Sequence, residues 1–198
     1  MTSPVVTALR ARGPGRVAVE LDHRPWRVVP LEAVVVAGLS VGSDLDRITA
    51  RALGRELRRL KARDAALRAL RTRDHTAASL ERRLEKRGTS PALRRETVAA
   101  VERAGLLDDE RFAVGRAAVL AGRGAGDLLI ADDLERQGVP PDAAQRAIDG
   151  LEAEAERADR LVAARGRSVR TLRFLGSKGF SEETMASLVA DLVPDGLG

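Results

Sequence analysis

Three consecutive acidic residues, Asp108, Asp109 and Glu110, are the first side chains that could do chemistry, because clustered carboxylates hold hard cations. No further oxygen ligands follow at the spacing of a calcium-binding loop. An aspartate just before a helix accepts hydrogen bonds from backbone N–H groups of the first turn. Acidic side chains in the first turn interact favourably with the positive end of the helix dipole. We therefore interpret Asp108 as a helix cap, with Asp109 and Glu110 in the first turn, and predict no metal site.

A glycine-rich stretch and two histidines also lack the pattern of a catalytic or cofactor site. Residues 122–126 have neither the GxGxxG nor the GxxxxGK(S/T) spacing of phosphate-binding loops, so they predict a loop between helices. His23 and His75 are the only histidines, and the chain has no cysteine, which leaves no zinc ligand set. No Ser/His/Asp order indicates a hydrolase. The sequence predicts a non-enzymatic protein without catalytic residues, metal or cofactor.

Basic residues are the informative polar feature. The net charge is +5, but residues 51–105 carry 16 Arg and Lys against 7 Asp and Glu, while residues 106–160 carry 7 against 13. Arginine pairs with phosphate or carboxylate through two parallel hydrogen bonds, so a basic surface indicates a polyanion or an acidic protein as partner. The alternative is an ordinary solvated helix face, with Glu81 and Glu85 as partners at helical spacing. The residues that we predict to contact the partner are Arg82, Arg83, Lys86, Arg87, Arg94, Arg95, Arg167, Arg170, Arg173 and Lys178.

The elements that position these side chains change in character at about residue 45. Residues 17–21 and 26–29 are short β-type runs separated by a turn, which predicts a hairpin in a small N-terminal module. Residues 31–37 predict a short helix that stops at Gly38, and Ser43 and Asp44 are candidate caps for the next helix. From about Asp46 to Leu192, leucines recur at three and four residues, which predicts helices almost throughout.

Glycines end these helices and reveal a repeat. At C′ a glycine takes the left-handed conformation without steric cost. The predicted positions are Gly88, Gly105, Gly138, Gly150, Gly166 and Gly179. Gly88, Gly138 and Gly179 superpose in one frame. A leucine lies four positions before each glycine, and Leu80, Ile130 or Thr171 lies eight positions before it. Apolar residues lie ten and thirteen positions after it, ending at Val101, Leu151 and Leu192. The sequence therefore predicts a mostly α-helical chain of stacked three-helix units. The expected domains are a β-containing module (1–45), a connecting helix (46–63) and helical repeats at 64–107, 108–154 and 155–194.

Several segments of this array resemble one family. They are Ala69–Leu80 with Leu84–Gly88, Gly105–Ala113 (GLLDDERFA), Asp133–Val139 and Arg173–Phe180. Over roughly residues 64–192 the chain is similar to the RecX family, bacterial regulators of the RecA recombinase. The resemblance implies three tandem three-helix repeats in an elongated curved array. It also implies binding to RecA and its filament on single-stranded DNA, with inhibition of the ATPase, recombinase and co-protease activities. Family members act in homologous recombination and the SOS response, and some contact DNA directly.

Two departures from the family pattern affect these expectations. At Thr76-x-x-Ser79 the family has a capping box that ends in glutamate, and we expect serine not to reach back to the cap amide. The second repeat is acidic and poor in aromatic residues, with Asp127-Leu128-Leu129 where basic residues are common. The high isoelectric point of the chain favours an alternative function, a basic helical DNA-binding protein that acts independently of RecA, while the acidic second repeat argues against a continuous DNA-binding track.

The composition also sets the expected surroundings of the protein. No apolar run approaches the roughly 20 residues of a membrane span, and residues 1–9 are too short and too weakly basic for a signal peptide. The absence of cysteine fits a reducing compartment. We expect a soluble cytoplasmic monomer that contacts no membrane.

Overall fold

The N-terminal residues form a three-stranded antiparallel sheet in the order β1 (Val6–Ala11), β2 (Arg16–Leu21) and β3 (Arg24–Pro30). The computed structural model describes residues 3–190 of the chain. The predicted hairpin of β2 and β3 is confirmed, and its turn contains Asp22 and His23 at φ angles of 49° and 63°. β1 adds a third strand to the predicted hairpin and pairs with the other edge of β2.

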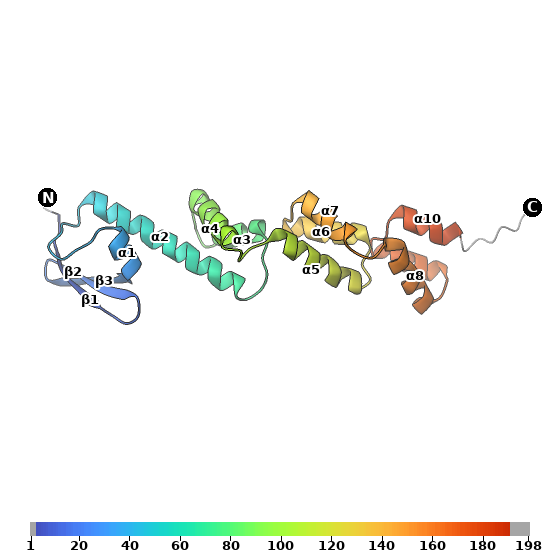
Figure 1. Cartoon of the computed structure of the whole chain (residues 1–198), viewed down its shortest axis with the longest axis horizontal. Helices are drawn as coiled ribbons and strands as arrows, with labels where there is room; N and C mark the ends of the chain where they lie inside the picture. Colours follow the sequence, from blue (N-terminus) through green and yellow to red (C-terminus); the bar gives the residue numbers. More distant parts are fainter. Residues whose placement is uncertain (1–2, 191–198) are drawn as a thin grey trace, which may run out of the picture. The chain divides into compact units, whose positions relative to one another are not determined.

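Two helices complete the N-terminal part of the chain (Figure 1). The helix α1 (Leu31–Val36) packs on the sheet, and Gly38 ends it at a φ of +68°, as predicted. The long helix α2 (Arg47–Leu70) starts at Asp46, whose Oδ1 accepts the Thr49 N–H at 2.7 Å. Neither Ser43 nor Asp44 caps it, because Ser43 Oγ donates to the Ser40 carbonyl within the preceding loop. The core joins the sheet, α1 and α2 through Val6, Val17, Val19, Val29, Ala33, Val34, Leu39, Leu45, Leu53 and Leu60.

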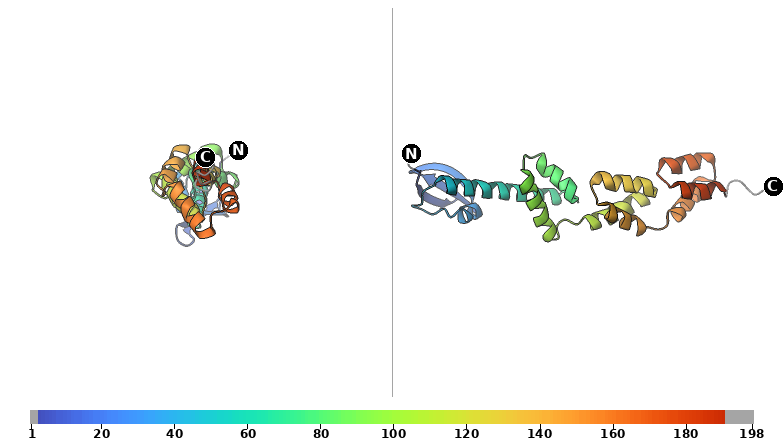
Figure 2. Two further views of the ribbon diagram at one scale, coloured as in Figure 1. Left: turned by 90° about the vertical axis from the view of Figure 1, so that its right-hand side faces the viewer. Right: turned by 90° about the horizontal axis from the view of Figure 1, so that it is seen from above.

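Eight further helices follow among residues 71–190. They are α3 (Ala77–Glu85), α4 (Pro91–Arg103), α5 (Asp109–Gly122), α6 (Asp127–Gln137), α7 (Pro141–Asp149), α8 (Glu154–Arg165), α9 (Val169–Ser177) and α10 (Glu182–Ala190). The helices α5, α6 and α7 pack around Ile130 and Leu134, and α8, α9 and α10 pack around Leu175 and Phe180. Figure 2 shows the ribbons of these helices from two further sides. The predicted fold, mostly α-helical with a small N-terminal β-module, is confirmed. No helix among the described residues is long and apolar enough to cross a membrane.

The described chain divides into two units. Unit 1 contains the residues up to Ala69 and Leu84–Ala99, and unit 2 contains Leu70–Arg83 and the residues from Ala100 onward. The expected boundary at residues 63 and 64 falls inside α2, whereas those at 107 and 154 lie close to the starts of α5 and α8. The division into three repeats stays a prediction, and its last apolar position, Leu192, lies outside the described residues.

Glycine turns end most helices as predicted. Gly88, Gly105, Gly138 and Gly179 have φ angles between +66° and +83°, and the residue after each donates its N–H to a carbonyl five residues back. Gly166 also has a positive φ. At Gly150 the predicted helix end is confirmed, because α7 ends at Asp149, but the predicted left-handed conformation is wrong. Gly150 keeps a helical φ of −79°, and its N–H still bonds to the Arg146 carbonyl.

Candidate partner-binding surface

The ten predicted partner-binding cations lie on or beside three helices. They are Arg82 and Arg83 on α3, Lys86 and Arg87 just after it, Arg94 and Arg95 on α4, Arg167 before α9, Arg170 and Arg173 on α9, and Lys178 at its end. Arg82, Arg83 and the four residues around α9 belong to unit 2, and the other four belong to unit 1. All are exposed except Arg94 and Lys178, which are half-buried. Most of these charges are therefore exposed to solvent, and they are divided between the two units.

Arg94 stabilises the turn between α3 and α4. Its Nη1 donates to the Thr89 carbonyl at 3.2 Å, and its Nη2 lies 3.1 Å from Glu85 Oε1. Only 15% of its side chain is exposed. These contacts give Arg94 a structural role, and its predicted contact with a partner stays a prediction.

Arg82 and Thr76 attach α3 to the turn after α6. The Thr76 hydroxyl donates to the Gln137 carbonyl at 2.7 Å, and Arg82 Nη2 donates to the same carbonyl at 3.2 Å. The turn approaches α3 so closely that a Cβ on Gly138 would lie 2.5 Å from the Ala78 Cβ. Arg82, one of the predicted partner-binding residues, thus also connects α3 to the end of α6.

The start of α3 has a reciprocal cap. Ser79 N–H donates to Thr76 Oγ1 and Thr76 N–H donates to Ser79 Oγ, both at 3.0 Å. The expectation that Ser79 could not reach the cap amide is therefore wrong, since the backbone brings the amide within reach of the short side chain. His75, immediately before the cap, is 4% exposed, and its Nδ1 lies 2.9 Å from Ser79 Oγ. Burial, with Arg73 and Arg83 nearby, lowers the pKa of His75, so the neutral ring is favoured at pH 7.

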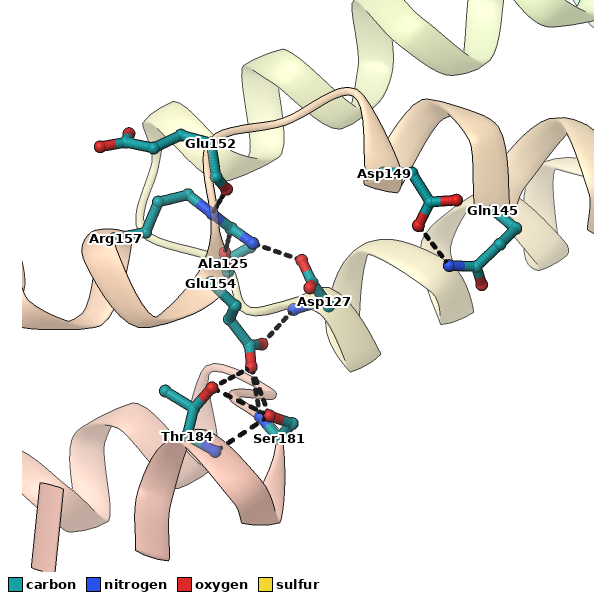
Figure 3. Close-up of polar contacts among 9 residues, drawn as sticks. All are labelled: Ala125, Asp127, Gln145, Asp149, Glu152, Glu154, Arg157, Ser181 and Thr184. Carbon is teal, nitrogen blue, oxygen red and sulfur yellow. Dashed lines mark hydrogen bonds and ion pairs between the residues drawn. The ribbon is translucent and has the colours of Figure 1, made fainter. Parts of the chain in front are cut away.

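Glu154, at the first position of α8, connects the two three-helix bundles (Figure 3). Its Oε1 accepts the Asp127 N–H at 2.7 Å, and its Oε2 accepts the Ser181 N–H at 3.0 Å and the Thr184 hydroxyl at 2.8 Å. The Ser181 hydroxyl donates to Oε2 as well. Burial by itself would raise the pKa of Glu154, but the hydrogen bonds from Ser181, Asp127 and Thr184 outweigh it and hold the pKa below its ordinary value.

Arg157, one turn further along α8, is buried in the same junction (Figure 3). Its guanidinium donates to the Ala125 carbonyl at 2.8 Å, to the Glu152 carbonyl at 3.0 Å, and to the Asp127 carboxylate. A buried cation is stable only when its donors are satisfied, and here each guanidinium nitrogen has an acceptor. The sequence did not reveal this role, because the charge pattern shows an arginine but not its burial.

The junctions before α5 and before α8 use the same device. Asp109 at the start of α5 accepts the Ala77 N–H of α3 at 2.8 Å, just as Glu154 at the start of α8 accepts the Asp127 N–H of α6. Each acid satisfies a backbone donor that the helix itself leaves free. Each helix start also donates to the carbonyl before the next turn glycine, through Thr76 Oγ1 to Gln137 and through Gly126 N–H to Lys178. In both junctions an acid in the first turn of one helix, α5 or α8, therefore caps the start of an earlier helix, α3 or α6.

The acidic triplet thus has structural partners. Asp108 caps α5 by accepting the Arg111 N–H at 2.9 Å, as predicted. Asp109 caps α3 instead of its own helix, and Glu110 Oε1 accepts a hydrogen bond from Arg146 Nη2 at 2.6 Å. Residues 123–126 form the predicted loop between α5 and α6. Among residues 3–190, no group of three His, Cys, Asp or Glu side chains is placed to hold a metal ion.

The basic group around α9 includes an arginine that we did not predict. The Arg165 guanidinium lies 3.9 Å from the centre of the Phe174 ring, and Lys178 Nζ lies 5.6 Å from it. Both distances are in the range of cation–π contacts. Phe174 therefore contacts two cations, and the exposed Arg170 and Arg173 lie on the same helix as Phe174.

No family model matches the sequence. Two curated relatives, each named "Regulatory protein RecX", are similar to it. The protein from Halorhodospira halophila is 32% identical over 138 residues, which cover 65% of this chain and 86% of the relative. The protein from Chromohalobacter salexigens is 31% identical over 137 residues, which cover 65% of this chain and 90% of the relative.

Two solved structures share the fold. One, described as "Crystal structure of regulatory protein RecX", matches with a TM-score of 0.77 and 19% identity, over 94% of this chain and 99% of the other. The second, RecX from Lactobacillus salivarius, matches with a TM-score of 0.59 and 20% identity, over 69% of this chain and 98% of the other. Because the first structure matches 94% of this chain, its similarity in fold extends to the N-terminal part.

Proposed function

The chain belongs to the RecX family of regulatory proteins, and from this premise we propose that it binds RecA or the RecA filament on single-stranded DNA and inhibits its ATPase, recombinase and co-protease activities. Binding alone accounts for such inhibition. A ligand that binds one state of the filament better than another shifts the filament toward that state. This mechanism requires surfaces rather than a catalytic centre.

The observation that carries the proposal is a set of exposed cations without acidic partners. In the part of the chain that the structure describes, six of the ten predicted residues are exposed and make neither a salt bridge nor a side-chain hydrogen bond. They are Arg83, Lys86, Arg87, Arg95, Arg170 and Arg173. Such charges are available to an acidic protein surface or to DNA phosphates, and both fit a filament of RecA on DNA.

The test is a titration of the single-strand-dependent ATP hydrolysis of RecA with this protein. We expect dose-dependent inhibition by the wild type. The triple variant R83E/K86E/R87E reverses three charges within five residues, and we expect it to need about tenfold more protein for half-inhibition. The control variant R12E/R24E/R47E makes the same change in net charge at exposed residues outside the predicted set, and it should inhibit like the wild type.

Two results would oppose the proposal. Wild-type inhibition by both triple variants would show that Arg83, Lys86 and Arg87 do not contact the filament. No inhibition by a folded wild type, together with binding to naked single-stranded DNA that falls steeply with salt, would favour the alternative of a DNA-binding protein independent of RecA.

A further inference from the structure

A second basic surface lies in unit 1 and shares only Arg87 with the ten predicted residues. One face of α2 and the turn between α3 and α4 enclose a groove of about 480 Å³. Its basic lining residues are Arg58, Lys61, Arg68 and Arg87. No acidic side chain lines the groove among the described residues. The groove therefore concentrates positive charge in a concave site.

The spacing of residues along α2 builds this groove. Arg58, Lys61 and Arg68 fall three and seven residues apart on one helix face, with Ala62 and Ala65 between them. These small alanines are buried and leave room above them for the long basic side chains, and half-buried Leu93 from α4 supplies apolar lining. At 1.5 Å per residue, the three cations of α2 span about 15 Å. The result is an apolar floor with a basic rim.

An ion pair joins the helices beside the groove, but most of the positive charges at its rim have no acidic partner among the described residues. Arg59 Nη2 lies 2.7 Å from Glu96 Oε1 and joins α2 to α4. Neither Lys61 nor Arg87 makes a salt bridge among the described residues, and Arg68 has only a distant contact, 4.0 Å from Asp64. A fixed concave site with unneutralised charge favours an anionic ligand.

We propose that this groove binds an acidic amphipathic segment of a partner protein. Apolar side chains of the segment contact half-buried Leu93 and the aliphatic stems of Arg58, Lys61 and Arg68, and its carboxylates pair with the basic rim. A nucleic acid fits the groove less well, because single-stranded DNA is held largely by stacking on aromatic rings and no aromatic residue lines the groove. The inference rests on the proposed function only in that both assume a protein partner.

The test uses the full chain and a fluorescent helical peptide of about 15 residues, with leucine on one face and glutamate elsewhere. Fluorescence anisotropy should show saturable binding. The variant K61E/R87E should weaken binding about tenfold or more. The matched control R51E/R55E, which changes two exposed residues of α2 outside the groove, should bind like the wild type. Circular dichroism melting checks that each variant is folded, and K61Q/R87Q replaces K61E/R87E if that variant unfolds.

Control peptides separate the two parts of the proposal. Replacing the leucines by serine, or the glutamates by glutamine, should each abolish saturable binding. Equal weakening by K61E/R87E and R51E/R55E would overturn the proposal, as would binding that is sensitive to K61E/R87E for oligothymidine but absent for the peptide. Self-association of the wild type that K61E/R87E removes would assign the groove to a second copy instead. RecA is absent from this assay, so its result is independent of the inhibition test.

Discussion

At the scale of single residues, we expect a nearly isosteric substitution of Glu154 to lower the stability of the protein strongly. Its carboxylate accepts hydrogen bonds from two backbone amides and two hydroxyls of unit 2. In Glu154→Gln the amide nitrogen faces donors and cannot accept from them. We expect the free energy of unfolding to fall by about 1–3 kcal/mol in a urea titration at pH 7. Asp159→Asn, an exposed acid on the same helix, should change it by less than about 0.5 kcal/mol.

The effect of Glu154 should also depend on pH in a known direction. Because the folded pKa lies below the ordinary value of 4.5, the stabilisation is complete above pH 4.5 and disappears as the pH falls through the folded pKa. The stability difference between wild type and Glu154→Gln should therefore shrink below pH 4.5. A difference that stayed constant from pH 7 to pH 3 would show that the charge of Glu154 contributes nothing.

The residues that sequence reasoning identified correctly are those whose partners are close along the chain. Asp108 caps the helix that begins one residue later, so its role follows from local spacing. Ser79 was wrongly excluded as a cap partner, because side-chain length was considered without the backbone geometry that brings Thr76 to it. Glu154 could not be identified at all, since its partners lie 27 and 30 residues away in the chain. Only the folded structure brings them together.

At the scale of elements, the turn glycines separate two physical effects. Gly88 and Gly138 end α3 and α6 with the same hydrogen-bond pattern and φ angles of +75° and +83°. A Cβ at Gly88 would meet nothing within 4 Å, whereas one at Gly138 would meet the Ala78 Cβ at 2.5 Å. We expect Gly88→Ala to cost about 1 kcal/mol from backbone strain, and Gly138→Ala to cost about 1–3 kcal/mol more from overpacking.

Thermal unfolding of the two glycine variants checks this difference. Similar losses of stability in Gly88→Ala and Gly138→Ala would mean that the turn after α6 does not press on α3. The positions of these turns could be predicted from the sequence, because glycine is the residue that accepts the left-handed conformation. Their contacts could not be predicted, and neither could the exception at Gly150, where a helical φ makes glycine dispensable for the turn.

At the scale of the whole molecule, the N-terminal module and α2 should behave as one folding unit. Leu53 and Leu60 of α2 are 2% and 8% exposed in the same core as Val6, Val19 and Val29, and Glu32 pairs with Arg63 at 3.2 Å. Deleting residues 1–45 would expose both leucines, at about 1.5–3 kcal/mol each. We expect the shortened chain to self-associate in size-exclusion chromatography with light scattering. Replacing Leu53 and Leu60 by glutamine in the shortened chain should restore a single small species, whereas the same change in the full chain should lower its melting temperature. A shortened chain that stays unassociated with its leucines intact would mean that the expected boundary near residue 45 separates independent domains.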